Sequence, residues 1–171
     1  LAPNKKKLLD WQKRNGFSTK DLQAIGLLSS DGNFFLFERR LLFPIENKTH
    51  PRGFAGRSLI NETMSSKYVN SPRTALFDKR RALFAPMGLT KNADLFVVEG
   101  YLDALALAEK NIPAVAVMSA HMTQEQARRI AQSNPKRITL AFDDDTSGRQ
   151  GIMRATALLL SENVARDALF L

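Results

Sequence analysis

Apolar residues in the second half of the chain fall into short runs that alternate with stretches of helical periodicity. Three runs cover residues 95–98, 114–118 and 138–142, and a fourth begins at Asp167. Predicted helices follow the first three: Leu102 to Lys110, a segment opened by a capping box at Thr123 and Gln126, and about Arg149 to Leu160. This order of strands and helices predicts a parallel sheet that is covered on both faces.

The first half of the chain has a different texture. Leu8, Leu9 and Trp11 form a helical stripe that ends at Gly16, and a second short helix is predicted from Ser18 to Gly26, with Leu22 and Ile25 on its inner face. Between Asn33 and about Leu59, runs such as 34–37 and 41–45 predict short antiparallel strands. Residues 60–91 show little periodicity, which predicts a long loop with a short helix.

The fold class is therefore α/β, with a small α+β subdomain at residues 1–91 and a mostly parallel sheet flanked by helices at residues 92–171. Charge follows the same division. The first part holds 17 Lys and Arg against 7 Asp and Glu, whereas the second holds 8 against 10. A basic half attracts polyanions, and an acidic cluster collects divalent cations. Solubility alone remains an alternative explanation for the basic excess.

Composition narrows the possible functions. The chain has no cysteine and only two histidines, His50 and His121, so we expect no disulfide and no zinc site. No apolar run approaches the roughly 20 residues that span a bilayer. We therefore expect a cytoplasmic protein without a membrane partner, whose metal, if it has one, is held by oxygen atoms.

Carboxylates cluster where two predicted strands end. Glu99 follows the first strand, Asp103 lies in the first turn of the next helix, and Asp143 and Asp145 follow the third strand. In parallel sheets functional groups gather at this edge, and alternation turns Asp143 and Asp145 the same way. Three carboxylates suit Mg²⁺, which supports phosphoryl transfer. The alternative for Asp145 is a helix N-cap.

The segments Val97 to Asp103 and Phe142 to Gly148 resemble the two signature motifs of the TOPRIM fold, in the Glu-Gly-Tyr-x-Asp form of bacterial primases. Upstream, three further segments resemble motifs of the primase amino-terminal subdomain: 40–45, 53–57, and 67–72 with Thr74, Phe77 and Lys79. The chain is thus similar to the catalytic core of DnaG-type DNA primases. A topoisomerase is less expected, because no catalytic tyrosine stands out. Both tyrosines of the chain, Tyr68 and Tyr101, already lie in primase-like motifs.

The resemblance implies roles for individual residues. Glu99, Asp143 and Asp145 would bind Mg²⁺ or Mn²⁺, with Asp103 as a further catalytic acidic residue. The residues that would contact template or nucleotide are Arg40, Arg57, Lys67, Tyr68, Asn70 and Lys79. For Tyr68, packing in the core is the alternative to stacking on a base.

The sequence departs from the family pattern at several places. Asp144 stands where primases usually have Gly, and residues 118–123 replace a turn that usually contains Leu-Gly-Thr, which leaves the role of His121 open. A later Asp-Pro-Asp-like motif, a helical subdomain and a helicase-binding domain are not present. We therefore expect either an excised catalytic fragment or a reduced relative from a mobile element.

The resemblance implies an enzyme of the primosome that synthesises short RNA primers on single-stranded DNA from ribonucleoside triphosphates. We expect a monomer, with the replicative helicase and single-strand-binding protein as partners through regions outside this chain. Two alternatives remain: a TOPRIM nuclease, and a non-catalytic module that binds single-stranded DNA.

Overall fold

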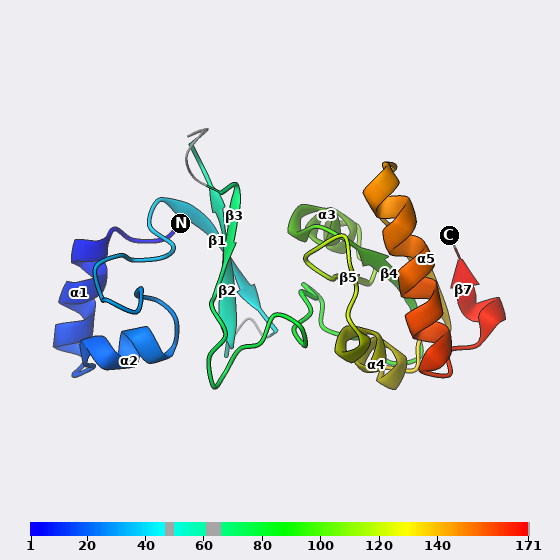
Figure 1. Ribbon diagram of the computed structural model, residues 1–171, viewed down its shortest axis with the longest axis horizontal. Helices are drawn as coiled ribbons and strands as arrows, with labels where there is room; N and C mark the ends of the chain where they lie inside the picture. The colour runs from blue at the N-terminus through cyan, green and yellow to red at the C-terminus, as the bar shows by residue number, and fades with distance from the viewer. Residues whose placement is uncertain (47–49, 61–65, 171) are drawn as a thin grey trace. The chain divides into compact units, whose positions relative to one another are not determined.

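The chain folds into two compact units, Leu1–Lys79 and Arg80–Leu171 (Figure 1). A computed structural model describes residues 1–46, 50–60 and 66–170. The boundary predicted from the sequence lies later, at residue 91. Residues 80–91 belong to the second unit, where Phe84 exchanges backbone hydrogen bonds of 3.0 and 2.8 Å with Ala116.

Two short helices open the first unit. Helix α1 (Lys5–Arg14) begins after Asn4, whose side chain accepts a hydrogen bond from the Lys7 N–H. Helix α2 (Thr19–Ala24) begins with a capping box formed by Ser18 and Asp21. Both predicted helices are thus confirmed. The prediction for Ile25 is wrong, because this residue caps the end of α2 and is 40% exposed.

A three-stranded antiparallel sheet completes the first unit, with strands β1 (Arg40–Ile45), β2 (Gly53–Ser58) and β3 (Tyr68–Asn70) in that order. The strand predicted at residues 34–37 does not form beyond an isolated bridge between Leu28 and Phe35. Instead, Phe35 and Phe37 are buried in the helical core. The short helix expected in residues 60–91 is absent from the described part of that segment, which contributes β3; residues 61–65 lie outside the described residues.

The two faces of this sheet have different surroundings. One face packs against the core built by α1 and α2, through Leu42, Phe54 and Val69. The other face holds Gly53 next to Phe77, and a Cβ atom at Gly53 would lie 2.6 Å from the ring carbon Cγ of Phe77. Only glycine therefore leaves room for the buried Phe77 ring.

The second unit is an alternation of strands and helices. Its elements are β4 (Asp94–Val98), α3 (Tyr101–Glu109), β5 (Ala114–Ala116), α4 (Gln124–Gln132), β6 (Arg137–Ala141), α5 (Thr146–Ser161), a 3₁₀ turn (Arg166–Ala168) and β7 (Leu169–Phe170). The strands are parallel, in the order β5-β4-β6-β7. The predicted parallel sheet is confirmed, although α5 begins before Arg149 and Leu171 lies outside the described residues.

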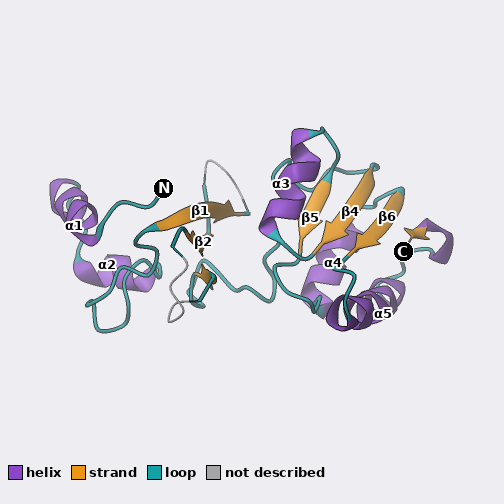
Figure 2. Ribbon diagram, turned by 90° about the horizontal axis from the view of Figure 1, so that it is seen from above, coloured by secondary structure: helices purple, strands orange, loops and turns teal. Residues whose placement is uncertain are grey.

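Strand order decides which face each helix covers. The chain moves from β4 to β5 in one direction along the sheet, and from β5 to β6 and β7 in the other. Because such crossovers are right-handed, α3 lies on one face and α4 and α5 lie on the opposite face (Figure 2). Ile130 of α4 and Leu159 of α5 pack there against Leu95 and Leu140.

No helix in residues 1–46, 50–60 or 66–170 combines the length and apolar character needed to cross a membrane.

Candidate active site

The carboxylates predicted from the sequence lie at the topological switch point of the parallel sheet. Strands β4 and β6 are neighbours, with Val98 paired to Ala141, and their following helices leave toward opposite faces. Such a divergence opens a crevice at the carboxyl ends of the two strands. Glu99 and Asp143 stand at this position, and the Asp143 N–H donates a hydrogen bond of 3.3 Å to Glu99 Oε1.

Asp145 is the N-cap of α5. Its Oδ1 accepts a hydrogen bond of 2.7 Å from the Gly148 N–H, so the N-cap interpretation is correct for one of its two carboxylate oxygens. The second oxygen has no hydrogen bond within the described residues. One side chain therefore both starts the helix and offers an oxygen toward solvent.

Gly148 sets how closely α5 approaches the loop after β6 that carries Asp143 and Asp145, which we call the carboxylate loop. A Cβ atom at this position would collide with the Asp143 carbonyl oxygen, and would lie 2.9 and 3.1 Å from the Asp143 carbonyl carbon and nitrogen. At Gly151, one turn later, a Cβ atom would press on the carbonyl oxygen of Ala120 and on the Phe142 ring. The two glycines thus seat α5 against the loops that follow β5 and β6.

The remaining acidic residues lie at the margin of this site. Asp144 is 92% exposed in its side chain and forms a 2.8 Å ion pair with Arg149, which compensates the extra charge noted in the sequence. Asp103, in the first turn of α3, is exposed, and its carboxylate lies against Gly100.

The donor set fits a hard divalent cation, because every side-chain donor is a carboxylate oxygen. Glu99, Asp143 and Asp145 are the residues that could hold it. In the part of the chain that the structure describes, no three acidic, histidine or cysteine side chains converge into a ready-made metal cage. The carboxylates influence one another electrostatically, but their oxygens are not gathered around one point.

The pKa of the Glu99 carboxyl is raised above its ordinary value. Burial is the largest cause, and the negative charges of Asp143 and Asp145 add to it, whereas the hydrogen bond from Asp143 and the charge of His121 oppose it. Burial, together with the nearby like charges, thus makes ionisation of Glu99 less favourable. A bound cation would offset the repulsion between the carboxylates.

This shift predicts a pH dependence of stability. A raised pKa in the folded state stabilises the fold below the unfolded pKa, near 4.5, and this contribution is lost as pH rises through the folded pKa. In thermal denaturation with EDTA, the parent chain should lose stability relative to Glu99→Gln above pH 4.5. The difference should be at most a few degrees, because the carboxyl is only partly buried, and Mg²⁺ should reduce it. Parallel curves for the two chains would contradict the assignment.

The loop after β5 is tied to the candidate site. The Met118 N–H donates a 2.9 Å hydrogen bond to the Glu99 carbonyl oxygen, which ties this loop to the site. Further along, an Nη atom of Arg154 on α5 lies 3.3 and 3.5 Å from the two ring nitrogens of His121. Sequence reasoning missed Arg154 and the glycines Gly148 and Gly151, since no pattern links their spacing on α5 to the loop.

The predicted basic residues of the first unit do not form one cluster. Pairing places Arg57 opposite Tyr68, with Asn70 on the same face, and the Arg57 guanidinium carbon lies 6.0 Å from the Tyr68 ring centre. Arg40 lies on the opposite face, where its Nη1 donates to the carbonyl oxygens of Gly56 and Ser66 at 3.2 and 2.9 Å. Arg40 thus contributes to holding the sheet together.

The last two basic candidates differ in exposure. Lys67 precedes β3 and is exposed, while its carbonyl oxygen accepts a hydrogen bond from the Ser58 N–H. Lys79 is half-buried, and burial lowers the pKa of its ammonium group. A desolvated ammonium group binds an anion more readily than a hydrated one, because part of its hydration is already lost.

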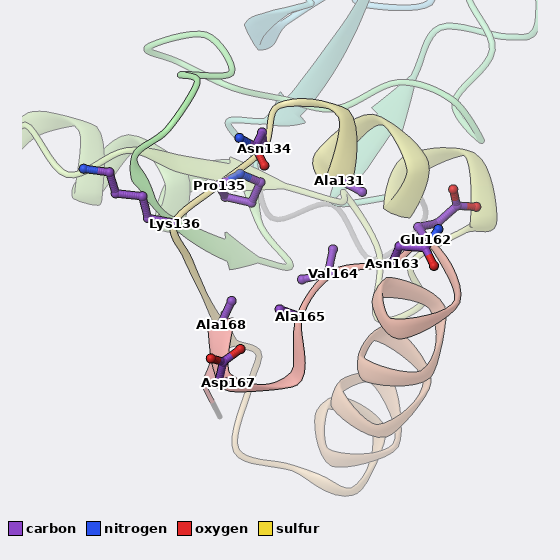
Figure 3. A pocket seen from close by; sticks show the side chains of 10 residues that line it. All are labelled: Ala131, Asn134, Pro135, Lys136, Glu162, Asn163, Val164, Ala165, Asp167 and Ala168. Carbon is purple, nitrogen blue, oxygen red and sulfur yellow. The ribbon is translucent and has the colours of Figure 1, made fainter.

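A cavity of about 350 Å³ lies at the other end of the second unit (Figure 3). It is bordered by Asn134 and Lys136, which precede β6, and by residues 162–165, 167 and 168 after α5. These segments adjoin the amino ends of the strands, whereas the carboxylates adjoin the carboxyl ends. The cavity is therefore separate from the candidate active site.

Comparison with known proteins matches both units. Residues 1–89 match the family described as the N-terminal domain of the DNA primase catalytic core, and residues 96–170 match a Toprim-like family. The DNA primase of Campylobacter jejuni is 36% identical over 153 residues, which cover 84% of this chain and 25% of the relative. That of Thermotoga maritima is 36% identical over 149 residues, or 82% and 26% of the two chains. The chain thus spans about a quarter of the length of these relatives.

Solved structures agree with this match. The zinc-binding and RNA polymerase domains of the Aquifex aeolicus primase superpose with a TM-score of 0.82 and 33% identity, covering 95% of this chain and 42% of that one. A DnaG primase catalytic domain bound to single-stranded DNA gives a TM-score of 0.73 and 32% identity, with coverages of 87% and 49%. With both units matched in order, the chain belongs to the family of DnaG-type DNA primases.

Proposed function

We propose that this chain carries the nucleotidyl-transfer centre of a primase, which joins ribonucleoside triphosphates into short RNA primers on single-stranded DNA. The proposal depends on one observation. The Asp143 N–H donates a hydrogen bond to the Glu99 carboxylate at the switch point of the parallel sheet, and Asp145, the N-cap of α5, follows two residues later. The family relationship supports it. We also propose that the reaction takes place in the cytoplasm, and that a replicative helicase and a single-strand-binding protein are partners of the longer protein.

In this proposal Glu99, Asp143 and Asp145 bind Mg²⁺ or Mn²⁺. A bound ion would neutralise charge on the phosphates and lower the pKa of the attacking hydroxyl group. The protein residues orient the reactants: the Asp143 N–H holds the Glu99 carboxylate, and the capped start of α5 holds Asp145. Arg57, Lys67, Tyr68, Asn70 and Lys79 are proposed to bind template or nucleotide.

Product analysis tests the proposal. The chain is incubated with single-stranded DNA, labelled ribonucleoside triphosphates and either Mg²⁺ or Mn²⁺. We expect short RNA products that require both template and metal. Shortening of end-labelled DNA without ribonucleotide incorporation would indicate a nuclease instead, and DNA binding without either reaction would indicate a binding module.

Arg40 and Arg57 should respond differently to substitution. Arg40→Ala should lower the free energy of unfolding by about 1–3 kcal/mol, because two backbone carbonyl groups lose a charged donor. Arg57→Ala should change stability by at most about 1 kcal/mol, since the interaction that its guanidinium group makes among the described residues is the contact with Tyr68. It should instead weaken binding of single-stranded DNA and reduce the slope of log affinity against log salt by about 0.7.

Urea denaturation and a salt titration of DNA binding measure the two effects. A destabilised Arg57→Ala chain with an unchanged salt slope would contradict the assignment of Arg57 to nucleic acid.

A further inference from the structure

Two aromatic side chains are stacked on the surface of the first unit, one on α1 and one just after it. Trp11, the only tryptophan of the chain, stacks on Phe17 with 5.4 Å between ring centres and 16° between ring planes. The two residues are 44% and 48% exposed. A flat aromatic surface of this kind, left open to water, is characteristic of a binding site rather than of a core.

The position of Phe17 is fixed by a buried polar side chain. Gln12 is 7% exposed, and its Nε2 donates a hydrogen bond of 2.9 Å to the Phe17 carbonyl oxygen. The Phe17 N–H donates in return to the Gln12 carbonyl oxygen at 3.1 Å. Gly16, with φ of +74°, makes the tight turn between them, and no atom lies within 4 Å of the place a Cβ would occupy there. The Phe17 backbone is therefore fixed next to the end of α1, and its ring stacks on Trp11 without a ligand.

Positive charge lies on the same side of α1 as Trp11. On α1, Lys7 and Arg14 lie four residues before and three after Trp11, so they share its side of the helix. Lys13 and Lys20 are nearby in sequence and are also exposed. None of these four cations has a carboxylate within 4 Å among the described residues. Two acidic residues are near in sequence. Asp21 accepts hydrogen bonds from Ser18 in the capping box, so Asp10 is the remaining carboxylate that could offset these positive charges.

We propose that Trp11 and Phe17 form a stacking platform for a base of single-stranded nucleic acid, with Lys7 and Arg14 binding the adjacent phosphates. Aromatic rings interleaved with unpaired cations suit this ligand, because every base offers a face for stacking and every nucleotide offers a negative charge. The platform is distinct from Arg57 and Tyr68. Helices α1 and α2 cover the face of the antiparallel sheet opposite to those residues.

The inference extends the proposed function without using the carboxylates or a metal. The two can therefore fail independently. All binding measurements are made with the full chain in EDTA, and are repeated with Asp143→Asn, which removes a carboxylate of the active site but leaves the platform intact.

The single tryptophan provides the test. Emission of Trp11 is recorded during titration with oligo(dT), and with an abasic deoxyribose-phosphate strand of the same length. We expect saturable quenching by oligo(dT) and little quenching by the abasic strand, because only bases can stack. Trp11→Leu should weaken binding of labelled oligo(dT) on the order of tenfold. The matched control is Phe34→Leu, which removes another exposed aromatic ring of this unit and should leave the affinity unchanged.

Trp11 emission that stays constant at saturating oligo(dT), or that is quenched equally by the abasic strand, would overturn the proposal. So would equal affinities for Trp11→Leu and Phe34→Leu chains. Either result would indicate that the ring pair does not bind a base and is available to contact another protein. Quenching by oligo(dT) in a chain that cannot synthesise primers, such as Asp143→Asn, would support the stacking platform without supporting the proposed catalytic function.

Discussion

Gly148→Ala is expected to reduce nucleotide incorporation by about 100-fold, although no reacting group is removed. A Cβ atom at this position collides with the Asp143 carbonyl oxygen and lies 2.9 and 3.1 Å from two other backbone atoms of Asp143. Backbone atoms cannot rotate away as a side chain can. The loop that carries Asp143 and Asp145 must therefore move, and a displacement of about 1 Å in a catalytic group costs on the order of 100-fold in rate.

The same substitution should lower the free energy of unfolding by about 1–3 kcal/mol, as is typical of overpacking. Alanine has a helix propensity better than glycine by up to about 1 kcal/mol, so a neutral or stabilising result is the outcome expected without the collision. Denaturation followed by circular dichroism, together with incorporation measured on folded protein, separates the two effects.

Gly100→Ala is the matched control. The added Cβ atom meets only the end of the Asp103 side chain, which can rotate away, and Gly100 has an ordinary backbone conformation with φ of −103°. We expect a change in stability below about 1 kcal/mol and a much smaller loss of activity than for Gly148→Ala. Equal effects of the two substitutions would contradict the proposed role of Gly148 as the close contact between α5 and the carboxylate loop.

Asp143→Asn and Glu99→Gln are expected to weaken Mn²⁺ binding at least about 10- to 100-fold, which is the range seen when only supporting residues of metal sites are changed. Each substitution keeps the size of the side chain and removes one anionic oxygen donor. Both should also retain the fold, because the hydrogen bond between the Asp143 N–H and Glu99 can still form with an amide oxygen.

Electron paramagnetic resonance of free Mn²⁺ measures this binding directly. Arg57→Ala serves as the control, since a guanidinium group is a cation without an oxygen donor and its removal should leave the Mn²⁺ affinity unchanged. Unaltered Mn²⁺ affinity in both carboxylate variants would show that the ion, if it binds, is held elsewhere.

Much of the second unit could be predicted from its sequence. The apolar runs at 95–98 and 138–142 became β4 and β6, and the capping box at Thr123 became the start of α4. Local signals were sufficient here, because a buried parallel strand and a capped helix are each specified by adjacent residues. The meeting of Glu99 with Asp143 followed from strand order, which the sequence pattern did not contain.

The first unit was less predictable. Phe34 to Phe37 has the composition of a strand, but burial of Phe35 and Phe37 in the helical core outweighed strand propensity. The opposite orientations of Arg40 and Arg57 depend on the register between β1 and β2, and a shift of one residue would reverse them. Likewise, the contact of Gly148 with Asp143 is a matter of backbone distance, for which a glycine in a helical sequence gives no specific signal.

The most direct test of the central proposal is ribonucleotide incorporation on single-stranded DNA by the parent chain, by Glu99→Gln and by Asp143→Asn, with Mg²⁺ and then Mn²⁺. We predict template-dependent RNA synthesis by the parent chain, and its loss in both variants while binding of single-stranded DNA is retained. Synthesis at the parental rate by both variants would contradict the assignment of the active site to these carboxylates.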